Sequence, residues 1–188
     1  MLKRVLDLLF SFLLLSFLWL PMVGIALLIR ADSSGGAIFR QVRIGRGGRP
    51  FVCYKFRTMV SDAPKNCPTS EMGDASSFVT PFGRLLRRTS LDELPQLLNV
   101  LKGDMSLVGP RPLIPVEEEV HTLRMRTGVY ALRPGMTGLS QISGRDFLDD
   151  REKVRLDARY LRRLGLREDA RIVIKTIRSV LYREGVRS

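Results

Sequence analysis

The residues most suited to chemistry are two adjacent carboxylates, Asp92 and Glu93, which follow Arg84, Arg87 and Arg88 in the chain. A divalent cation such as Mg²⁺ binds one or two carboxylates together with phosphate oxygens and water. Arginine guanidinium groups match the geometry of phosphate oxygens, and a carboxylate can act as a nucleophile toward phosphorus. One interpretation of the pattern is therefore a site that binds a divalent cation and a phosphate together.

The same carboxylates also have a structural interpretation. Ser90 and Glu93 form the S-x-x-E pattern of a capping box, in which each side chain accepts a hydrogen bond from the backbone amide of the other residue. Acidic residues in the first turn of a helix also suit its dipole. The two interpretations are compatible, because an ordered helix start presents its amide-rich end to a phosphate.

Further basic residues are candidates for phosphate binding. Arg111 lies between two prolines in the string GPRP, and the prolines stiffen the backbone around it. Lys55 and Arg57 lie on a predicted β-hairpin. Each of these residues, taken alone, also fits the role of a solvated surface charge.

The composition limits what else the chain can be. It has 188 residues and a formal net charge of +12, yet its mean hydropathy is +0.02, so its apolar residues must be concentrated in one segment. The length fits one domain. Two cysteines, Cys53 and Cys67, and one histidine, His121, argue against a zinc cluster, a histidine-based triad and a disulfide framework. The low cysteine content favours a reducing compartment.

The apolar segment covers residues 5–29 and contains a single charge, Asp7. It reaches the roughly 20 residues needed to cross a bilayer, and it is too long for the core of a typical cleaved signal peptide. Basic residues flank both ends, so the positive-inside rule places both ends on the cytoplasmic side. Pro21 can bend a helix, which favours a segment that enters the membrane and turns back; a single span with a tolerated proline is the alternative.

The rest of the chain shows a succession of helix, hairpin and loop signals. Alternating apolar and basic residues around positions 45–48 predict the β-hairpin, and residues 61–80 are expected to form a surface loop. Leucine spacing predicts one helix from Ser90 to Lys102-Gly103, and a second is expected over residues 117–126. Residues 133–145 are expected to form a glycine-punctuated loop.

The segment 151–188 carries 12 basic and five acidic residues, with an apolar stripe among the arginines. The stripe fits either a helix packed on the domain or one that lies in a membrane surface. Its members are Leu161, Leu164, Ile172, Ile174, Ile177, Val180 and Leu181.

Three long strings carry a family resemblance, which runs from residue 3 to about residue 160. They are FRQVRIGRGGRPFVCYKFRTM, LLRRTSLDELPQLLNVLKGDMSLVGPRPL and RPGMTGLSQISGR. The chain resembles the bacterial sugar transferase family, in particular its small monotopic polyprenyl-phosphate phosphoglycosyl transferases. The extent matches the small members, which are little more than the catalytic domain.

The resemblance implies roles for individual residues. Asp92 falls on the nucleophile of the family and Glu93 on its partner at the Mg²⁺ site. Arg87 and Arg111 fall on arginines at the phosphates, Lys55 falls on the lysine of the KFRTM string, and Arg57 is the arginine of the same string. Asp157 corresponds to an acidic residue of a later D-x-x-Y stretch and is grouped with the phosphate-binding residues. The family's re-entrant helix is broken by a Ser-Pro pair, where this chain has Leu20-Pro21.

The resemblance also implies an α/β fold that is α-rich, with a small β-hairpin or sheet. A re-entrant membrane helix would occupy residues 1–32, and a compact cytosolic catalytic domain with interfacial amphipathic helices would occupy residues 33–188. The implied reaction transfers a sugar 1-phosphate from a UDP-sugar to polyprenyl phosphate at the cytoplasmic face of the bacterial inner membrane. The implied partners are these substrates and membrane lipids but no nucleic acid, with a homodimer left open.

The alternative from another class is a non-catalytic, membrane-anchored basic module that binds nucleic acid or anionic lipid. Its support is the abundance of arginine and a pI near 10.6. Against it, aromatic residues make up only 7% of the chain, whereas single-stranded nucleic acids bind to surfaces on which bases stack on aromatic side chains.

Overall fold

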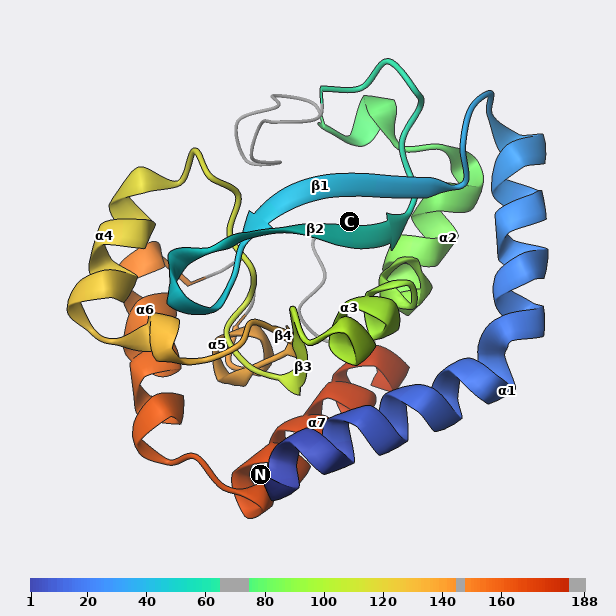
Figure 1. The fold of residues 1–188 in the computed structure, drawn as a ribbon. Coiled ribbons are helices and arrows are strands. Elements are labelled where there is room, and N and C mark those ends of the chain that lie inside the picture. The colour runs from blue at the N-terminus through green and yellow to red at the C-terminus, as the bar shows by residue number, and fades with distance from the viewer. Residues whose placement is uncertain (65–74, 145–147, 183–188) are drawn as a thin grey trace.

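Helices dominate the computed structural model, which describes residues 1–64, 75–144 and 148–182 (Figure 1). The helices are α1 (Leu2–Asp32), α2 (Pro81–Thr89), α3 (Gln96–Lys102), α4 (Glu118–Arg126), α5 (Leu139–Ile142), α6 (Asp150–Arg162) and α7 (Leu166–Tyr182). The strands are β1 (Ile38–Ile44), β2 (Pro50–Phe56), β3 (Ser106–Val108) and β4 (Gly135–Thr137). Short 3-10 helices lie at Arg46–Gly48, Ala75–Phe78, Leu91–Glu93 and Val129–Ala131. The α-rich fold with little sheet agrees with the prediction from the sequence.

Helix α1 is long and apolar enough to cross a membrane, and it is the one helix of the described residues with that property. Many of its large apolar side chains are exposed, such as Phe17 at 79% and Trp19 at 60%. Figure 1 shows a sharp bend within the helix. Pro21 lies inside it and explains the bend, because proline lacks the amide hydrogen of a helical bond and clashes with the preceding turn.

The first half of α1 is held by polar contacts to the body of the protein. The Arg4 guanidinium donates to the carbonyl oxygen of Val100 at 2.7 Å. Asp7 is buried, although it belongs to an apolar helix, and accepts hydrogen bonds from the Ser106 hydroxyl at 2.8 Å and the Leu107 amide at 3.2 Å. A buried carboxylate needs such donors to offset its desolvation, so these bonds fix the helix against β3.

The second half of α1 packs on the same body through apolar contacts. Ile29 is 2% exposed and forms a core cluster with Phe56 of β2 and Leu86 of α2. Met22 and Ile25 pack against this cluster from the same helix. Both halves of the bent helix therefore contact one globular unit.

Strands β1 and β2 form the predicted antiparallel hairpin, with Arg40 opposite Tyr54 and Val42 opposite Val52. Its turn contains Gly47 and Gly48 at φ +69° and +73°, values that favour glycine. Because side chains alternate along a strand, the hairpin presents one face to the interior.

The predicted helix from Ser90 is broken into a 3-10 helix (Leu91–Glu93) and α3. The capping box is also wrong: Ser90 ends α2 in the left-handed region with φ 56°, and its side chain caps no helix. The Glu93 amide donates to the Ser90 carbonyl oxygen at 3.2 Å instead. Pro95 at the start of α3 lacks the amide hydrogen needed for continuous helix through this region. The predicted end at Lys102-Gly103 is confirmed, with Gly103 at φ +96°.

Residues 133–144 are more ordered than the predicted glycine-punctuated loop, because they contain β4 and α5. Strand β4 pairs in parallel with β3, with Ser106 opposite Gly135. A Cβ atom on Gly135 would lie 2.1 Å from the backbone nitrogen of Gly109, so only glycine permits this approach. The close contact places residues 109–112 beside β4.

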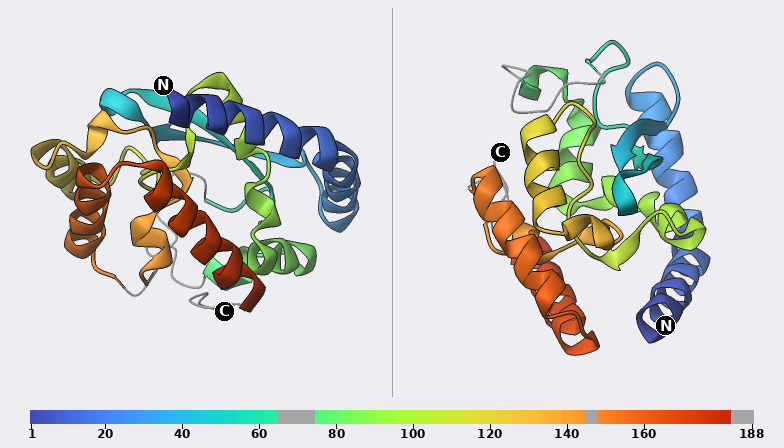
Figure 2. Two further views of the ribbon diagram at one scale, coloured as in Figure 1. Left: turned by 90° about the horizontal axis from the view of Figure 1, so that it is seen from below. Right: turned by 60° about the vertical axis from the view of Figure 1, so that its left-hand side comes forward.

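The C-terminal stripe packs on the domain in part, and its position in a membrane surface stays a prediction. Ile172 of α7 is fully buried and packs with Val108 and Tyr160. Ile177 and Leu181 are 55% and 72% exposed, and the view from below shows α7 in front of the body, near α1 (Figure 2). Of the predicted loop over residues 61–80, residues 65–74, including the second cysteine, lie outside the described residues.

Candidate active site

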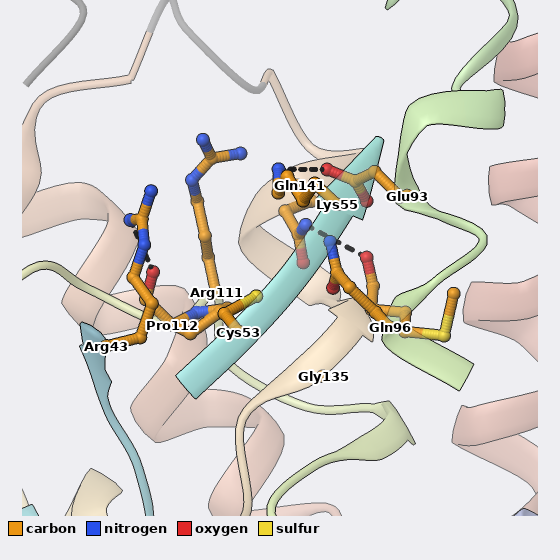
Figure 3. A pocket seen from close by; sticks show the side chains of 10 residues that line it. Arg43, Cys53, Lys55, Glu93, Gln96, Arg111, Pro112, Gly135 and Gln141 are labelled. Atoms are coloured by element: carbon orange, nitrogen blue, oxygen red, sulfur yellow. Dashed lines mark hydrogen bonds and ion pairs between the residues drawn. The ribbon is translucent and has the colours of Figure 1, made fainter. Parts of the chain in front are cut away.

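A carboxylate and an ammonium group form the centre of an open pocket (Figure 3). The Lys55 Nζ atom lies 2.8 Å from Oε1 of Glu93, and both side chains are about one-quarter exposed. Strand β2 supplies the lysine, and the 3-10 helix before α3 supplies the glutamate. The pocket is lined by Arg43, Cys53, Lys55, Glu93, Gln96, Arg111, Pro112, Gly135, Met136 and Gln141.

Asp92 lies beside this ion pair and is half-buried. Burial raises the pKa of its carboxyl group to about 6, with Glu93 adding to the rise and Lys55 and Arg87 opposing it. The Nε of Arg87 donates to the Thr58 hydroxyl at 2.9 Å, which orients the guanidinium. At neutral pH the Asp92 carboxylate is therefore mostly ionised and surrounded by cations, as a nucleophile toward an anionic phosphate needs to be.

Arg111 is exposed at the pocket, while the backbone that carries it is held firmly. Arg124 donates to the Arg111 carbonyl oxygen at 2.7 Å, and Arg43 donates to that of Pro112 at 3.1 Å. In Figure 3 the guanidinium groups of Arg111 and Arg43 extend toward the same side as the Lys55–Glu93 pair. The Arg111 side chain makes no hydrogen bond with any residue in the described part of the chain, so its donors are available to a ligand.

Asp157 does not line the pocket but lies behind it. It is 1% exposed and accepts hydrogen bonds from Arg124 and from the Ser140 hydroxyl, both at 2.8 Å. Because Arg124 also binds the carbonyl oxygen of Arg111, the contacts of Asp157 support the pocket wall and do not reach its interior.

Arg57 also lies outside the pocket, although only two residues separate it from Lys55. Its guanidinium is buried and donates to backbone carbonyl oxygens at the end of α1, including those of Ser33 at 2.7 Å and Ser34. It also donates to the Ser61 hydroxyl at 3.1 Å. These contacts match those expected of a cation at a helix C-terminus and join the membrane-length helix to the residues after β2.

Seven of the lining residues were not predicted as site residues from the sequence, among them Arg43, Cys53, Gln96 and Gln141. Two of them, Cys53 and Gln96, could have been predicted from their spacing to predicted site residues. Cys53 and Lys55 are two residues apart on one strand and therefore share a face, and Gln96 follows Asp92 by four residues. Arg43 and Gln141 reach the pocket only through the tertiary fold.

The carboxylates fit a Mg²⁺ ion of the kind that is held partly by its substrate. Within the described residues, no cluster of three or more histidine, cysteine or acidic side chains could form a cage for a metal ion. Mg²⁺ in phosphoryl-transfer sites is commonly bound by one or two carboxylates together with substrate phosphates and water. Asp92 and Glu93 provide that number of carboxylates, and Arg111 lies at the same pocket with no hydrogen bond from its side chain to the described residues.

These features define a membrane-associated protein with a pocket that is lined by Glu93, Lys55 and two arginines, while Asp92 lies next to Glu93 outside the lining. The chain belongs to the bacterial sugar transferase family, whose sequence profile matches residues 1–183. It is 42% identical, over 95% of its length, to UDP-glucose:undecaprenyl-phosphate glucose-1-phosphate transferase of Caulobacter vibrioides, of which it spans 69%.

Two further relatives act, by their names, on other sugars. The chain is 40% identical to undecaprenyl-phosphate galactose phosphotransferase of Salmonella typhimurium, with 98% of the chain matched to 41% of that protein. It is 36% identical to an N-acetylgalactosaminephosphotransferase of Aeromonas hydrophila, with 98% of the chain matched to 45% of that protein. The chain thus spans less than half of these two relatives, and their names differ in the sugar.

Proposed function

We propose that the protein transfers a sugar 1-phosphate from a UDP-sugar to polyprenyl (undecaprenyl) phosphate and releases UMP, as the first membrane step of a bacterial glycoconjugate pathway. The observation that carries the proposal is the pocket in which Lys55 and Glu93 pair at 2.8 Å beside the ionisable Asp92 and the free donors of Arg111. Membership of the family and the names of the relatives support the reaction type.

In the first step, an oxygen of the Asp92 carboxylate attacks the β-phosphorus of the UDP-sugar. The bond from that phosphorus to the oxygen bridging the two phosphates breaks, UMP leaves, and a phosphosugar is joined to Asp92 as a mixed anhydride. Arg87, Arg111 and Lys55 bind the phosphate oxygens and lower the repulsion between the carboxylate and the diphosphate. Because the nucleophile is ionised at neutral pH, no histidine is needed to remove a proton.

In the second step, a phosphate oxygen of the polyprenyl phosphate attacks the phosphorus of the aspartyl intermediate. The bond to Asp92 breaks, the carboxylate is restored, and the lipid carries a diphosphate-linked sugar. When bound at Asp92 and Glu93, Mg²⁺ supplies positive charge that polarises the phosphoryl oxygens.

We further propose that α1 is re-entrant and that the pocket lies at the cytoplasmic face of the inner membrane. Two observations support this placement: α1, which contains Pro21, is bent (Figure 1), and its two halves both contact the same body, through Asp7 and Ile29. One globular unit cannot bind both ends of a helix from opposite sides of a bilayer. The basic flanks of α1 and the exposed apolar face of α7 also suit an anionic membrane surface.

A panel of UDP-sugars tests the proposal and identifies the sugar. The protein in detergent or nanodiscs is incubated with each UDP-sugar, Mg²⁺ and undecaprenyl phosphate, and released UMP is measured. At least one UDP-sugar is expected to give UMP that depends on the protein. Turnover of none, together with salt-dependent binding to nucleic acid, would favour the non-catalytic basic module instead.

A further inference from the structure

Gln96 is a buried residue whose side-chain amide lies at the pocket without a hydrogen-bond partner among the described residues. The residue begins α3, is 2% exposed and lines the pocket (Figure 3). Among the described residues, none forms a hydrogen bond with its side chain. Native proteins pair nearly all buried polar groups, so an unpaired amide at the wall of a pocket points to a partner that comes from outside the chain.

Gln141 provides a second, independent observation in the same pocket. Its Nε2 donates to the Met136 carbonyl oxygen at 3.3 Å, which is a long hydrogen bond. Its Oε1 is buried and has no hydrogen-bond partner in the described part of the chain. The residue lies on α5, whereas Gln96 lies on α3, so amides from two separate elements line one pocket with unused hydrogen-bonding capacity.

We infer that Gln96 and Gln141 form a neutral subsite that hydrogen-bonds the hydroxyl groups of the sugar in the nucleotide-sugar substrate. The inference rests on the proposed function and names the part of the substrate that this wall binds. Each primary amide offers both donors and an acceptor, which suits a hydroxyl group that can donate and accept. The cations of the pocket are placed for phosphates, and neutral amides are suited to the uncharged part of the substrate.

The position of the amides indicates that they bind the sugar and not the nucleoside or the polyprenyl chain. Lys55, which binds the phosphate oxygens in the proposed mechanism, lines the same pocket as the amides, and so does Glu93, which would hold Mg²⁺ there. The sugar is bonded directly to that phosphate, whereas the nucleoside is separated from it by a second phosphate. The polyprenyl chain has no hydrogen-bonding groups and gains nothing from an amide.

Replacement of each glutamine by leucine tests the subsite. In the Gln96→Leu variant no hydrogen bond between described residues is lost, so the melting temperature is expected to stay the same or to rise. The KM for the preferred UDP-sugar is expected to rise about three- to tenfold, because a neutral hydrogen bond to substrate has been removed. The inhibition constant of UDP, which lacks the sugar, is expected to stay unchanged. Gln141→Leu is expected to change the KM and the inhibition constant in the same way, although it also loses the long hydrogen bond to the Met136 carbonyl oxygen.

Lys153→Ala is the control, because this partly exposed lysine of α6 pairs with Asp150 and does not line the pocket. An unchanged KM in both leucine variants would overturn the inference. An equal rise in the KM of the UDP-sugar and the inhibition constant of UDP would also overturn it, because the amides would then bind the nucleotide. Failure of the unmodified protein to use any UDP-sugar would refute the proposed function and the inference with it, whereas normal turnover with unaffected variants would refute the inference alone.

Discussion

The buried ion pair behind the pocket gives the sharpest prediction about stability. Asp157→Ala removes the acceptor of two hydrogen bonds, from Arg124 and from Ser140, each 2.8 Å long. The two charged side chains are 4% and 1% exposed, so water cannot replace the lost carboxylate. The variant leaves the Arg124 guanidinium buried without its counter-ion, and one further nitrogen of that group, Nε, has no partner in the described part of the chain.

The expected cost follows from this burial. Breaking a buried ion pair by removing one partner lowers the free energy of unfolding by about 3–5 kcal/mol, which corresponds to a fall in melting temperature on the order of 10 °C for a chain of this size. The double replacement of Arg124 and Asp157 by leucine is expected to recover much of the loss, because no unpaired charge remains. Asp150→Ala is the matched control: its pair with Lys153 is exposed, so the expected cost is about 1 kcal/mol or less.

Thermal unfolding in detergent, followed by circular dichroism, measures these differences, and UMP release is measured well below the melting temperature of each variant. The folded Asp157→Ala protein is expected to keep its KM for the UDP-sugar within a few-fold. The reasoning would be refuted if the variant melted like the unmodified protein but had a strongly raised KM. Asp157 would then be a substrate ligand, as the family resemblance implied, and not a support for the wall.

Three further predictions concern the cation site, α2 and α7. Because burial raises the pKa of Asp92 to about 6, its carboxyl group becomes protonated as the pH falls through 6. The Mg²⁺ affinity measured by calorimetry should therefore be flat above pH 7 and drop by up to about tenfold per pH unit below pH 5.5. A steady affinity down to pH 4.5 would contradict this expectation. In Gly83→Ala the new Cβ would lie 2.1 Å from the Thr58 carbonyl oxygen, so a lower melting temperature is expected. Slower UMP release is also expected, because Arg87 is oriented by its hydrogen bond to Thr58. An unchanged melting temperature and an unchanged rate would show that the two backbone segments separate freely. Ile177 is 55% exposed, so Ile177→Lys should weaken flotation with anionic vesicles without lowering the melting temperature. Unchanged flotation would show that α7 does not lie in the membrane surface.

Local patterns in the sequence predicted several elements correctly. The alternation around positions 45–48 predicted β1 and β2, and the expected helix over residues 117–126 is confirmed within one residue as α4. Pro21 was identified as the bend in α1, because the loss of a helical hydrogen bond at proline is a property of the residue itself.

The features that failed depend on contacts between distant parts of the chain. The S-x-x-E string did not form a capping box, because Ser90 ends the preceding helix in the left-handed region and Glu93 pairs with Lys55, 38 residues away. Lys55 and Arg57 look equivalent in the sequence, yet β2 ends between them, and Arg57 turns to the end of α1. No local pattern marks Gln141 as a pocket residue, because its helix reaches the site through tertiary contacts such as the pairing of β3 and β4.

The central claim is that Asp92 becomes covalently joined to the phosphosugar. The most direct measurement is the intact mass of the protein after incubation with its UDP-sugar and Mg²⁺ without polyprenyl phosphate, followed by peptide mapping. The account predicts one added phosphosugar on the peptide that contains Asp92, one equivalent of released UMP, and neither in the Asp92→Asn variant. Full turnover with acceptor, but no adduct and no UMP release without it, would contradict the covalent route, as would undiminished UMP release by Asp92→Asn.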